Sequence, residues 1–553
     1  MTLISRFVLN RKKVKAILLL IISASLAAAG TWWATSHAIS PSSGSVGSAS
    51  PVIPCTYLFY INGSNYLAKN CTTGQVDYSG TTFSTVFTST MTAGGSGLYF
   101  LRKGTYTITS QLSISSDSVT ICGETPLGTV LREANGLNLQ GVIYSSNHNN
   151  IRICNLQIDG NGSNQSGTNA DIVSLFITGN FQNVTVDSNY LHDGKAGNIH
   201  IRIPGGGGPG TNHGVRILNN IVGKSYSNAD SADNIFLSNS YDSLIQGNTV
   251  IGSSHIGIIG GSGGDYGIRI VSNSIYVTAS FAGIFEDGNF GNYLHDVTVS
   301  DNSVWGTGVG NGIEVGFAVE KTTISSNTIN GTLNGVRILS SRDITLTGNS
   351  ITYSQRFGIE IFNSTDVTVS TNVFRLSARA GNAYSELSIE GGSGDMTITG
   401  NTLDGARTGN EYGILVDTGQ AKFIENVTIT SNIFRSMLEA VRLLQGRHYT
   451  ISDNMVSGSI RVGIHLGNET QSLVTGNSII GNGSGGSYSG IVLESTAGGN
   501  VITGNISSQN TYYGIEMNLS GKNIVVANDL RFNTTGPFTG SVGTDMMANN
   551  MLS

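Results

Sequence analysis

Short stretches in which apolar and polar residues alternate recur along most of the chain. Each stretch begins at a glycine or another small residue, as in Gly335-Val336-Arg337-Ile338, and a second one follows, such as Ile344-Thr345-Leu346-Thr347. Alternation with a period of two places every second side chain on one face, which is the pattern of a β-strand with one buried face. The sequence therefore predicts many short strands whose Ile, Val and Leu side chains point inward.

An asparagine that follows a small residue closes most of these units. The asparagines that mark the repeat are Asn155, Asn189, Asn220, Asn248, Asn273, Asn302, Asn327, Asn349, Asn372, Asn401, Asn432, Asn454, Asn477, Asn505 and Asn528. Their mean spacing is about 27 residues, which is typical of a solenoid whose units are too small to bury a face alone. We expect the asparagine amides to form a ladder, in a rod of about 67 Å at about 4.8 Å per coil.

The two ends of such a rod have to be covered, because an exposed strand edge promotes aggregation. Phe83, Val86, Phe87 and Met91 recur at helical spacing, so residues 81–92 are predicted to form an amphipathic helix over the first coil. At the other end the repeat fades. The predicted β-helix therefore covers residues 81–530, and residues 531–553 are predicted to form a cap or a tail.

Composition narrows the class of protein further. The chain has 553 residues, with 74 Gly, 7 Pro and only 12% charged residues, which disfavours a disordered tail, a coiled coil or a helical bundle. The formal net charge is -6, although the first 29 residues carry five basic residues and no acidic one. The rest of the chain is thus more acidic and repels a phosphate backbone, so we expect no nucleic-acid partner.

The first residues have the features of an export signal. Basic residues precede an apolar run, Ala16–Ala29, that ends in small residues. One interpretation is cleavage after Ala29; the other is a signal anchor that extends through Trp33 and is long enough to span a bilayer. Both interpretations, for residues 1–39, place the rest of the chain outside the cytoplasm, secreted or anchored on the extracellular face. Residues 40–54 are a Ser, Gly and Pro linker, and membrane contact is expected only through an uncleaved N-terminal segment.

Four cysteines in an exported chain suggest disulfides. Cys55 and Cys71 flank a short aromatic segment within residues 55–80 and are candidates to close one loop. Cys122 and Cys154 end the matching strings Val-Thr-Ile-Cys and Ile-Arg-Ile-Cys, and stacking of these strings would bring their Cα atoms about 4.8 Å apart. Two buried thiols are the alternative for this second pair.

The residues of the first predicted coils resemble those of a known family. Leu98-Tyr99-Phe100, then Gly104-Thr105-Tyr106-Thr107-Ile108 and Val119-Thr120-Ile121-Cys122-Gly123, resemble the entry coils of the pectin-lyase-like superfamily of right-handed parallel β-helices. The later Gly-Ile-x-Ile and Gly-Asn units look like the repeats of that superfamily, so the resemblance covers roughly residues 75–530. It implies an all-β fold with three strands per coil, in which the glycine-initiated strand comes first and the asparagine lies at the second turn. It also implies insertions at the third turn.

The resemblance implies little about chemistry, since that superfamily contains polysaccharide lyases, glycoside hydrolases, epimerases, phage tailspikes and non-catalytic surface proteins. It does imply that a polysaccharide substrate lies along the outer face of the first strand. By alternation, that face presents one column of side chains: His200, Phe236, Ile259, Phe285, Glu314, Arg337, Glu360, Ser388, Leu415, Arg442, His465, Val492 and Glu516.

Residues 192–287 hold the densest set of candidate site residues on this face. A polysaccharide lyase needs a base beside a uronate carboxylate and a cation to stabilise the charge that develops. We assign the candidate base to Lys195, His200 or Arg202, substrate contacts to His192, His213, Phe236 and Phe285, and a possible Ca²⁺ to Asp230, Asp233 and Asp287. The alternative is a solvated face whose polar residues do no chemistry.

A second stretch of charge is Glu314, Arg337 and Glu360 in successive coils, which we interpret as a structural ladder of ion pairs. The motifs of the polygalacturonase branch are missing, so hydrolysis of that type is not predicted. Three hypotheses remain: a uronate polysaccharide lyase or epimerase, a non-catalytic carbohydrate-binding or adhesive surface protein, and a structural spacer of the cell envelope.

Overall fold

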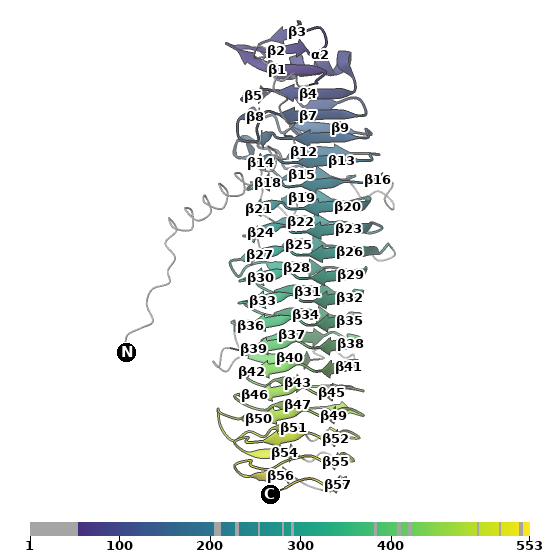
Figure 1. The fold of residues 1–553 in the computed structure, drawn as a ribbon, viewed down its shortest axis with the longest axis vertical. Helices are drawn as coiled ribbons and strands as arrows, with labels where there is room; N and C mark the ends of the chain where they lie inside the picture. Colours follow the sequence, from purple (N-terminus) through teal and green to yellow (C-terminus); the bar gives the residue numbers. More distant parts are fainter. Residues whose placement is uncertain are drawn as a thin grey trace, which may run out of the picture. The chain divides into compact units, whose positions relative to one another are not determined.

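The computed structural model describes residues 54–203, 212–226, 232–252, 255–278, 281–288, 292–380, 384–405, 411–417, 423–494, 497–518, 521–540 and 546–552. The predicted export signal, residues 1–39, and nearly all of the linker lie outside the described residues. Cys55–Ser553 form one compact unit. This unit is a stack of coils that lie one above another along a single axis (Figure 1). The predicted all-β solenoid is therefore confirmed.

Each coil contributes one strand to each of three parallel sheets. In one coil, for example, β34 (Ile359–Phe362) belongs to the first sheet, β35 (Thr365–Ser370) to the second and β36 (Val373–Arg375) to the third. The next coil starts with β37 (Tyr384–Glu390), which pairs with β34 in parallel. We call the connection between the first and second sheets the first turn, that between the second and third sheets the second turn, and the remaining one the third turn.

The first sheet carries the face on which the sequence predicts a site. Its strands there are β12 (Val173–Thr178), β15 (Gly197–Ile201), β19 (Asp233–Leu237), β22 (Ile256–Gly260), β25 (Ala282–Glu286), β28 (Asn311–Val315), β31 (Val336–Leu339), β34, β37, β40 (Glu411–Asp417), β43 (Val441–Leu443), β47 (Ile464–Leu466), β51 (Ile491–Leu493) and β54 (Tyr513–Met517). The register of these strands confirms the predicted outward column at every step from His200 to Glu516.

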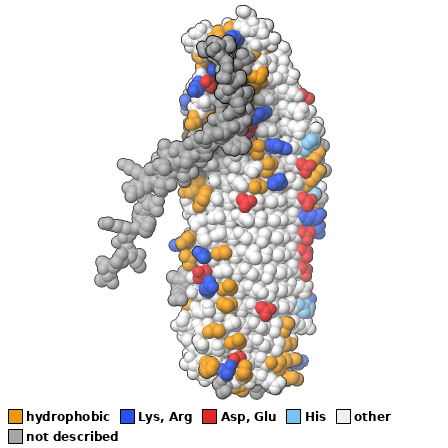
Figure 2. All heavy atoms as spheres, in the orientation of Figure 1, with side chains coloured by type: hydrophobic (Ala, Val, Ile, Leu, Met, Phe, Trp, Pro, Cys, Tyr) orange, Lys and Arg blue, Asp and Glu red, His pale blue; other side chains and the backbone are white. Residues whose placement is uncertain are grey.

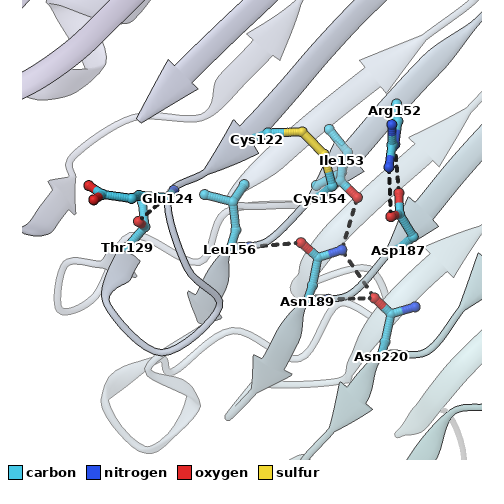
Figure 3. Close-up of a disulfide and its surroundings, with 10 residues drawn as sticks. All are labelled: Cys122, Glu124, Thr129, Arg152, Ile153, Cys154, Leu156, Asp187, Asn189 and Asn220. Atoms are coloured by element: carbon cyan, nitrogen blue, oxygen red, sulfur yellow. Dashed lines mark hydrogen bonds and ion pairs between the residues drawn. A yellow bond between two sulfur atoms is a disulfide. The ribbon is translucent and has the colours of Figure 1, made fainter. Parts of the chain in front are cut away.

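The asparagine ladder at the second turn fixes this register (Figure 3). Asn189 Nδ2 donates to Asn220 Oδ1 at 3.1 Å and to the Ile153 carbonyl oxygen at 2.9 Å, and the Asn189 backbone N–H donates to the same Asn220 Oδ1 at 3.0 Å. The amide-to-amide bond repeats through Asn189, Asn220, Asn248, Asn273, Asn302, Asn327, Asn349, Asn372, Asn401, Asn432, Asn454, Asn477, Asn505, Asn528 and Asn550. We call each asparagine position a rung of the ladder. Every rung thus satisfies the hydrogen-bonding needs of buried polar groups in two neighbouring coils.

The ladder differs from the prediction at both ends. Asn155 has φ 53° and lies one position before the rung, which Leu156 occupies instead. At the C-terminal end, β56 (Gly536–Gly540) pairs with β54, β57 (Met546–Ala548) pairs with β55 (Ile524–Val526), and Asn550 adds a rung. The prediction that residues 531–553 leave the repeat was wrong, because backbone pairing continues there without an alternating aliphatic pattern.

Two backbone requirements explain the small residues of the repeat. The residue before a rung adopts a left-handed conformation, with φ 58° at Ser188 and 64° at Gly348, which small or polar residues tolerate best. At the start of the first-sheet strand, a Cβ added to Gly335 would lie 2.4 Å from the carbonyl oxygen of Gly358 in the next coil. Glycine is therefore required there by the close approach of two coils.

An aromatic cap covers the N-terminal end of the stack. Strands β1 (Tyr57–Asn62), β2 (Asn65–Asn70) and β3 (Val76–Gly80) form an antiparallel sheet, and β1 also pairs in parallel with β4 (Gly97–Leu101) of the solenoid. Helix α2 (Phe83–Gly94) buries Phe83, Val86, Phe87 and Met91, two residues further along than the predicted range 81–92. No helix among the described residues has the length and apolarity needed to cross a membrane.

Both candidate cysteine pairs form disulfides. Cys55 is bonded to Cys71 with a Cα–Cα distance of 5.5 Å. This bond joins the residues before β1 to the residue that follows β2. Cys122 and Cys154 face each other in register on adjacent strands and are bonded with a Cα–Cα distance of 4.6 Å (Figure 3). Stacking of the two matching strings, predicted from the sequence, brings this second pair together.

A mid-ladder substitution tests whether the asparagines hold the coils in register. Asn349 donates to the Ile324 carbonyl and to Asn372, and its own Oδ1 accepts from Asn327. We expect Asn349→Ala to lower the free energy of unfolding by about 3 kcal/mol, since buried partners lose their bonds. The measurement is a denaturant midpoint followed by circular dichroism. Asn330→Ala, which removes one bond to Thr352, is the control and should cost less than about 1 kcal/mol; equal shifts would contradict a special role of the ladder.

Glu286 is a carboxylic acid inside the solenoid. It follows the outward Phe285 on β25, is 0% exposed and lies in register with the core residue Val315. Within the described residues, neither of its carboxyl oxygens has a hydrogen-bond partner. Burial raises the pKa of Glu286 well above its usual value of 4.5.

Glu286 therefore makes stability depend on pH. Because the folded-state pKa is raised, its contribution is fully present below the unfolded-state pKa and is lost as the pH rises through the folded-state pKa. We expect Glu286→Gln to melt higher than wild type at pH 8 and to show a smaller difference at pH 4. Differential scanning fluorimetry across this pH range measures the melting temperatures of both proteins. Glu390→Gln, on the outer face, is the control. An unchanged pH slope in Glu286→Gln would refute the assignment.

Candidate ligand-binding face

The outer face of the first sheet presents parallel columns of side chains that run along the stack. Residues on neighbouring strands in one column lie about 4.8 Å apart, so the face brings together side chains separated by 20 to 40 positions in sequence. Figure 2 shows acidic and basic side chains following one another along the right-hand edge of the molecule, whereas much of the surface towards the viewer is uncharged.

His200 and Arg202, two of the three candidate bases, are held by structural contacts. His200 is 0% exposed, with Nε2 3.1 Å from the Asp233 carbonyl oxygen and Nδ1 3.5 Å from Asp171 Oδ1. Arg202 Nε donates to the same Asp171 oxygen at 3.0 Å. Burial alone would raise the pKa of Asp171, but His200 and Arg202 outweigh it and lower that pKa. A buried imidazole in this network is not accessible to a sugar.

Lys195 and His192 lie at the third turn beside this network. Lys195 is half-buried in the short segment between β14 (Tyr190–His192) and β15. His192 Nδ1 donates to Asp193 at 2.7 Å, and Gln157 donates to His192 Nε2 at 2.8 Å. His192 therefore has both ring nitrogens engaged within the turn.

Metal ligation by the predicted aspartates is not supported by the register. Leu237 at the end of β19 faces Gly260, and Phe285 faces Ile259, so Asp287 lies two coils and five strand positions from Asp233, about 19 Å away. Oxygen ligands of one Ca²⁺ all lie within about 2.6 Å of the ion, so these two cannot share it. Asp233 instead accepts a hydrogen bond from His255 at 2.9 Å. The third predicted ligand, Asp230, lies outside the described residues.

Another acidic group of the described chain approaches the geometry of a metal site. The ligand atoms of Asp159, His192 and Asp193 lie within 4.8 Å of one another. Arg132 pairs with Asp159 at 3.3 Å, and His192 is occupied as described above. The group is thus satisfied by its own neighbours.

The predicted aromatic contacts divide between two faces. Phe236 and Phe285 are half-buried on the outer face of the first sheet, where the Phe236 ring packs under the Arg202 guanidinium at 4.7 Å. The Phe285 and Phe281 rings pack edge to face, with 4.9 Å between their centroids. His213, in contrast, belongs to the second sheet and packs at a tilt against Tyr241, with 5.1 Å between the ring centroids, so it does not line the same face.

Glu314, Arg337 and Glu360 form the predicted charge ladder. Arg337 Nη1 is 3.7 Å from Glu314 and its Nε is 2.9 Å from Glu360. Burial raises the pKa of both carboxyl groups, although the charge of Arg337 opposes the shift in each case. Because the guanidinium lies between the two carboxylates, no glycosidic bond fits between them, and the ladder is structural.

Four arginines on or beside the first sheet stack on tyrosine rings, a feature that reasoning from the sequence missed; a fifth, Arg342 over Tyr293 at 4.9 Å, belongs to the second sheet. Three of these pairs lie at the third turn, and their distances are measured from the guanidinium carbon to the centroid of the tyrosine ring. They are Arg356 over Tyr384 at 5.8 Å, Arg379 over Tyr353 at 5.4 Å and Arg461 over Tyr488 at 5.9 Å. We call these six residues the third-turn rim. No carboxylate lies within ion-pair distance of Arg356, Arg379 or Arg461 in the described part of the chain. The only sequence signal was an Arg three to five residues before a first-sheet strand.

The fourth pair belongs to a polar network on the sheet itself. Arg442 Nη1 donates to the Tyr412 hydroxyl at 2.9 Å and lies 3.5 Å from Glu439. His465, the next residue in the column, contacts Glu439 through Nδ1 at 3.0 Å and Glu494 through Nε2 at 2.8 Å. Alternation predicted that Arg442 and His465 are neighbours, but it did not show that Glu439 and Glu494 meet the imidazole from either side.

Comparisons with known proteins match this architecture. Residues 385–550 match a family described as right handed beta helix region, and residues 233–405 match one described as periplasmic copper-binding protein (NosD). No curated protein matches the chain. Within the described part of 233–405, His255 and His295 pair separately with Asp233 and Asp296, so no donor set for copper gathers there.

Solved structures resemble the chain at low sequence identity. The pre-mature gene product 12 of bacteriophage phi29 aligns with a TM-score of 0.52 and 11% identity over 85% of this chain and 70% of its own. A mutant tailspike protein of the E. coli bacteriophage HK620, in complex with a pentasaccharide, gives a TM-score of 0.48 and 12% identity over 80% and 76%. An exopolygalacturonase from Thermotoga maritima gives 0.37 and 11% over 61% and 87%. These likenesses concern the fold alone.

The register, the three-sheet coil and the family match agree on one architecture. The handedness stated for the matched family is the one that the resemblance of the first coils implied. The chain has the fold of a right-handed parallel β-helix, as the resemblance of its first coils to the pectin-lyase-like superfamily implied.

Proposed function

We propose that this protein is exported and binds an acidic polysaccharide along the third-turn rim and the adjoining outer face of the first sheet. The observation that carries the proposal is the set of arginines that stack on tyrosine rings without a carboxylate partner among the described residues. Arg356 and Arg379 are exposed, and Arg461 is half-buried. Such side chains remain available to an external anion.

The chemistry of the rim suits a sugar that carries a carboxylate or a sulfate. Stacking uses the flat face of a guanidinium and leaves its N–H groups free to donate to an oxyanion in a bidentate way. A tyrosine ring beside it offers an apolar surface to the face of a sugar ring. The tyrosines also hold the arginine side chains in place, which reduces the entropy lost on binding.

The spacing of the rim favours a polymer over a single sugar. The first-sheet register places Arg356 and Arg461 four coils apart, about 19 Å at about 4.8 Å per coil. Arg379 lies at the third turn between them in sequence. An extended chain can touch all three, whereas a monosaccharide can touch only one, so we expect affinity to rise with chain length.

Two observations support export. The structure pairs all four cysteines, and disulfides persist in oxidising compartments outside the cytoplasm. The family that matches residues 233–405 is described as periplasmic. Secretion or anchoring on the outer face of the membrane, as inferred for residues 1–39, is part of this proposal.

A uronate lyase or epimerase is the second candidate function. The arrangement that favours it is His465 beside Arg442 on the same face. These reactions need a base, which here is the neutral imidazole present above the pKa of His465, next to a carboxylate whose charge is neutralised. The test is absorbance of unsaturated uronate after incubation with alginate or polygalacturonate. We expect His465→Gln to abolish any such signal; a signal that survives this substitution would exclude His465 as the base.

The binding proposal is tested with the double variant Arg356→Ala/Arg461→Ala. We expect at least a tenfold weaker affinity for polygalacturonate at low salt, because two charge-assisted contacts are lost, and a smaller difference at high salt. Isothermal titration calorimetry measures the affinity, and uncharged dextran should not bind. The control is Arg342→Ala, whose guanidinium is paired with Glu320 at 2.6 Å on the second sheet. Equal losses in both variants, or no binding by wild type, would contradict the proposal.

A further inference from the structure

We propose that His465 and Arg442 form a subsite for the carboxylate of a sugar, and that the carboxylate of Glu494 occupies this subsite until a ligand displaces it. The inference rests on the proposed polysaccharide binding and adds to it the ligand group and an internal competitor.

The contacts of His465 require a cation. Its Nδ1 is 3.0 Å from Glu439 Oε2 and its Nε2 is 2.8 Å from Glu494 Oε1, so each ring nitrogen faces a carboxylate oxygen. A carboxylate accepts hydrogen bonds, and an imidazole donates from both nitrogens only when it is protonated. The two bonds are therefore made together by the imidazolium and not by the neutral ring.

The two glutamates differ in freedom. The Glu439 side chain is 4% exposed and also contacts Arg442, so it is fixed beneath the imidazole. The Glu494 side chain is 49% exposed, and His465 is its hydrogen-bond partner in the described part of the chain. Rotation of Glu494 into water exposes His465 Nε2, whereas Glu439 has no such route. An incoming carboxylate can therefore replace Glu494 and leave Glu439 in place.

Arg442 adds a second positive charge to the subsite. It lies opposite His465 on the adjacent strand, about 4.8 Å away along the stack. Its guanidinium is held by the Tyr412 hydroxyl at 2.9 Å and over the Tyr412 ring at 5.3 Å. The Arg442 Nε atom is buried and, among the described residues, has no hydrogen-bond partner. An anion at His465 Nε2 thus lies one strand away from a second cation, Arg442.

The charges around the imidazole set its pH dependence. Burial alone would lower the pKa of His465, but Glu439 and Glu494 outweigh both burial and the charge of Arg442 and raise that pKa above its usual value of 6.5. On the strand side, Val492 of β51 is uncharged and next in the column. Burial raises the pKa of Glu469, near Glu494, to about 9, so that carboxyl is neutral at pH 7. The subsite therefore binds anions below the pKa of His465 and loses them as the pH rises through it.

Displacement of Glu494 is tested by calorimetry on the full chain with oligogalacturonate. We expect Glu494→Gln to bind about tenfold more tightly at pH 6, because the competing charge is gone, and to lose this gain as the pH is raised through the pKa of His465. Fully methyl-esterified oligogalacturonate, which lacks the carboxylate charge, should bind both proteins equally. The half-exposed position of Glu494 makes a folding defect unexpected, and circular dichroism checks this.

Two further variants separate a subsite from a general charge effect. Glu390→Gln removes a carboxylate that bonds to Ser388 on the same edge of the first sheet, so any gain in affinity should be independent of pH. In His465→Gln, binding should weaken at pH 6, and adding Glu494→Gln should bring no gain. Wild-type binding with an unchanged affinity in Glu494→Gln would overturn the subsite and leave the proposed function intact. No binding of any acidic glycan by wild type would overturn both.

Discussion

Parallel pairing of each coil with the next, in strict register, is the constraint on which the rest of this protein depends. Backbone hydrogen bonds alone permit a strand to slip, but the buried asparagine ladder does not, because a slipped coil would leave amide groups without partners. The left-handed residue before each rung and the glycine at the start of a first-sheet strand serve the same stacking. Side-chain columns on the outer face are a direct consequence.

Those columns determine where chemistry can occur. Arg337 meets Glu314 and Glu360 only because two coils place them on either side of it, and His465 meets Glu439 and Glu494 in the same way. The first group is closed, since the cation fills the space between its carboxylates. The second has one exposed member, and the third-turn rim has cations with free donors. These groups contain similar residue types, and they differ in whether their charged side chains are accessible to a ligand.

Several buried acids make stability depend on pH in the same direction. Burial raises the pKa of Asp265 to about 7, of Glu386 to about 8 and of Glu469 to about 9, in the same direction as for Glu286. Folding is therefore favoured at low pH, where these carboxyl groups are protonated in both states. The cationic form of His465, which the proposed subsite needs, is favoured by the same conditions. Stability and ligand binding are thus expected to weaken together as the pH rises.

The sequence by itself determined the all-β solenoid, the outward column from His200 to Glu516 and the stacking that makes Cys122 and Cys154 neighbours. These follow from local alternation and from a repeat that stacks like on like, so they need no knowledge of distant contacts. It also placed the ends of the repeat wrongly, at Asn155 and after residue 530, where backbone pairing does not depend on the side-chain pattern.

Only the tertiary structure decided which side chains on the outer face are available. His200 points outward, as predicted, yet Asp171 and the Asp233 backbone enclose it. Asp233 and Asp287, both assigned to a metal, fall in separate coils, and the arginines of the third-turn rim stack on tyrosine rings 26 to 28 positions away in sequence. Turn lengths vary from coil to coil, and they decide which side chains cover or meet one another. Alternation shows the direction of a side chain but not what lies above it.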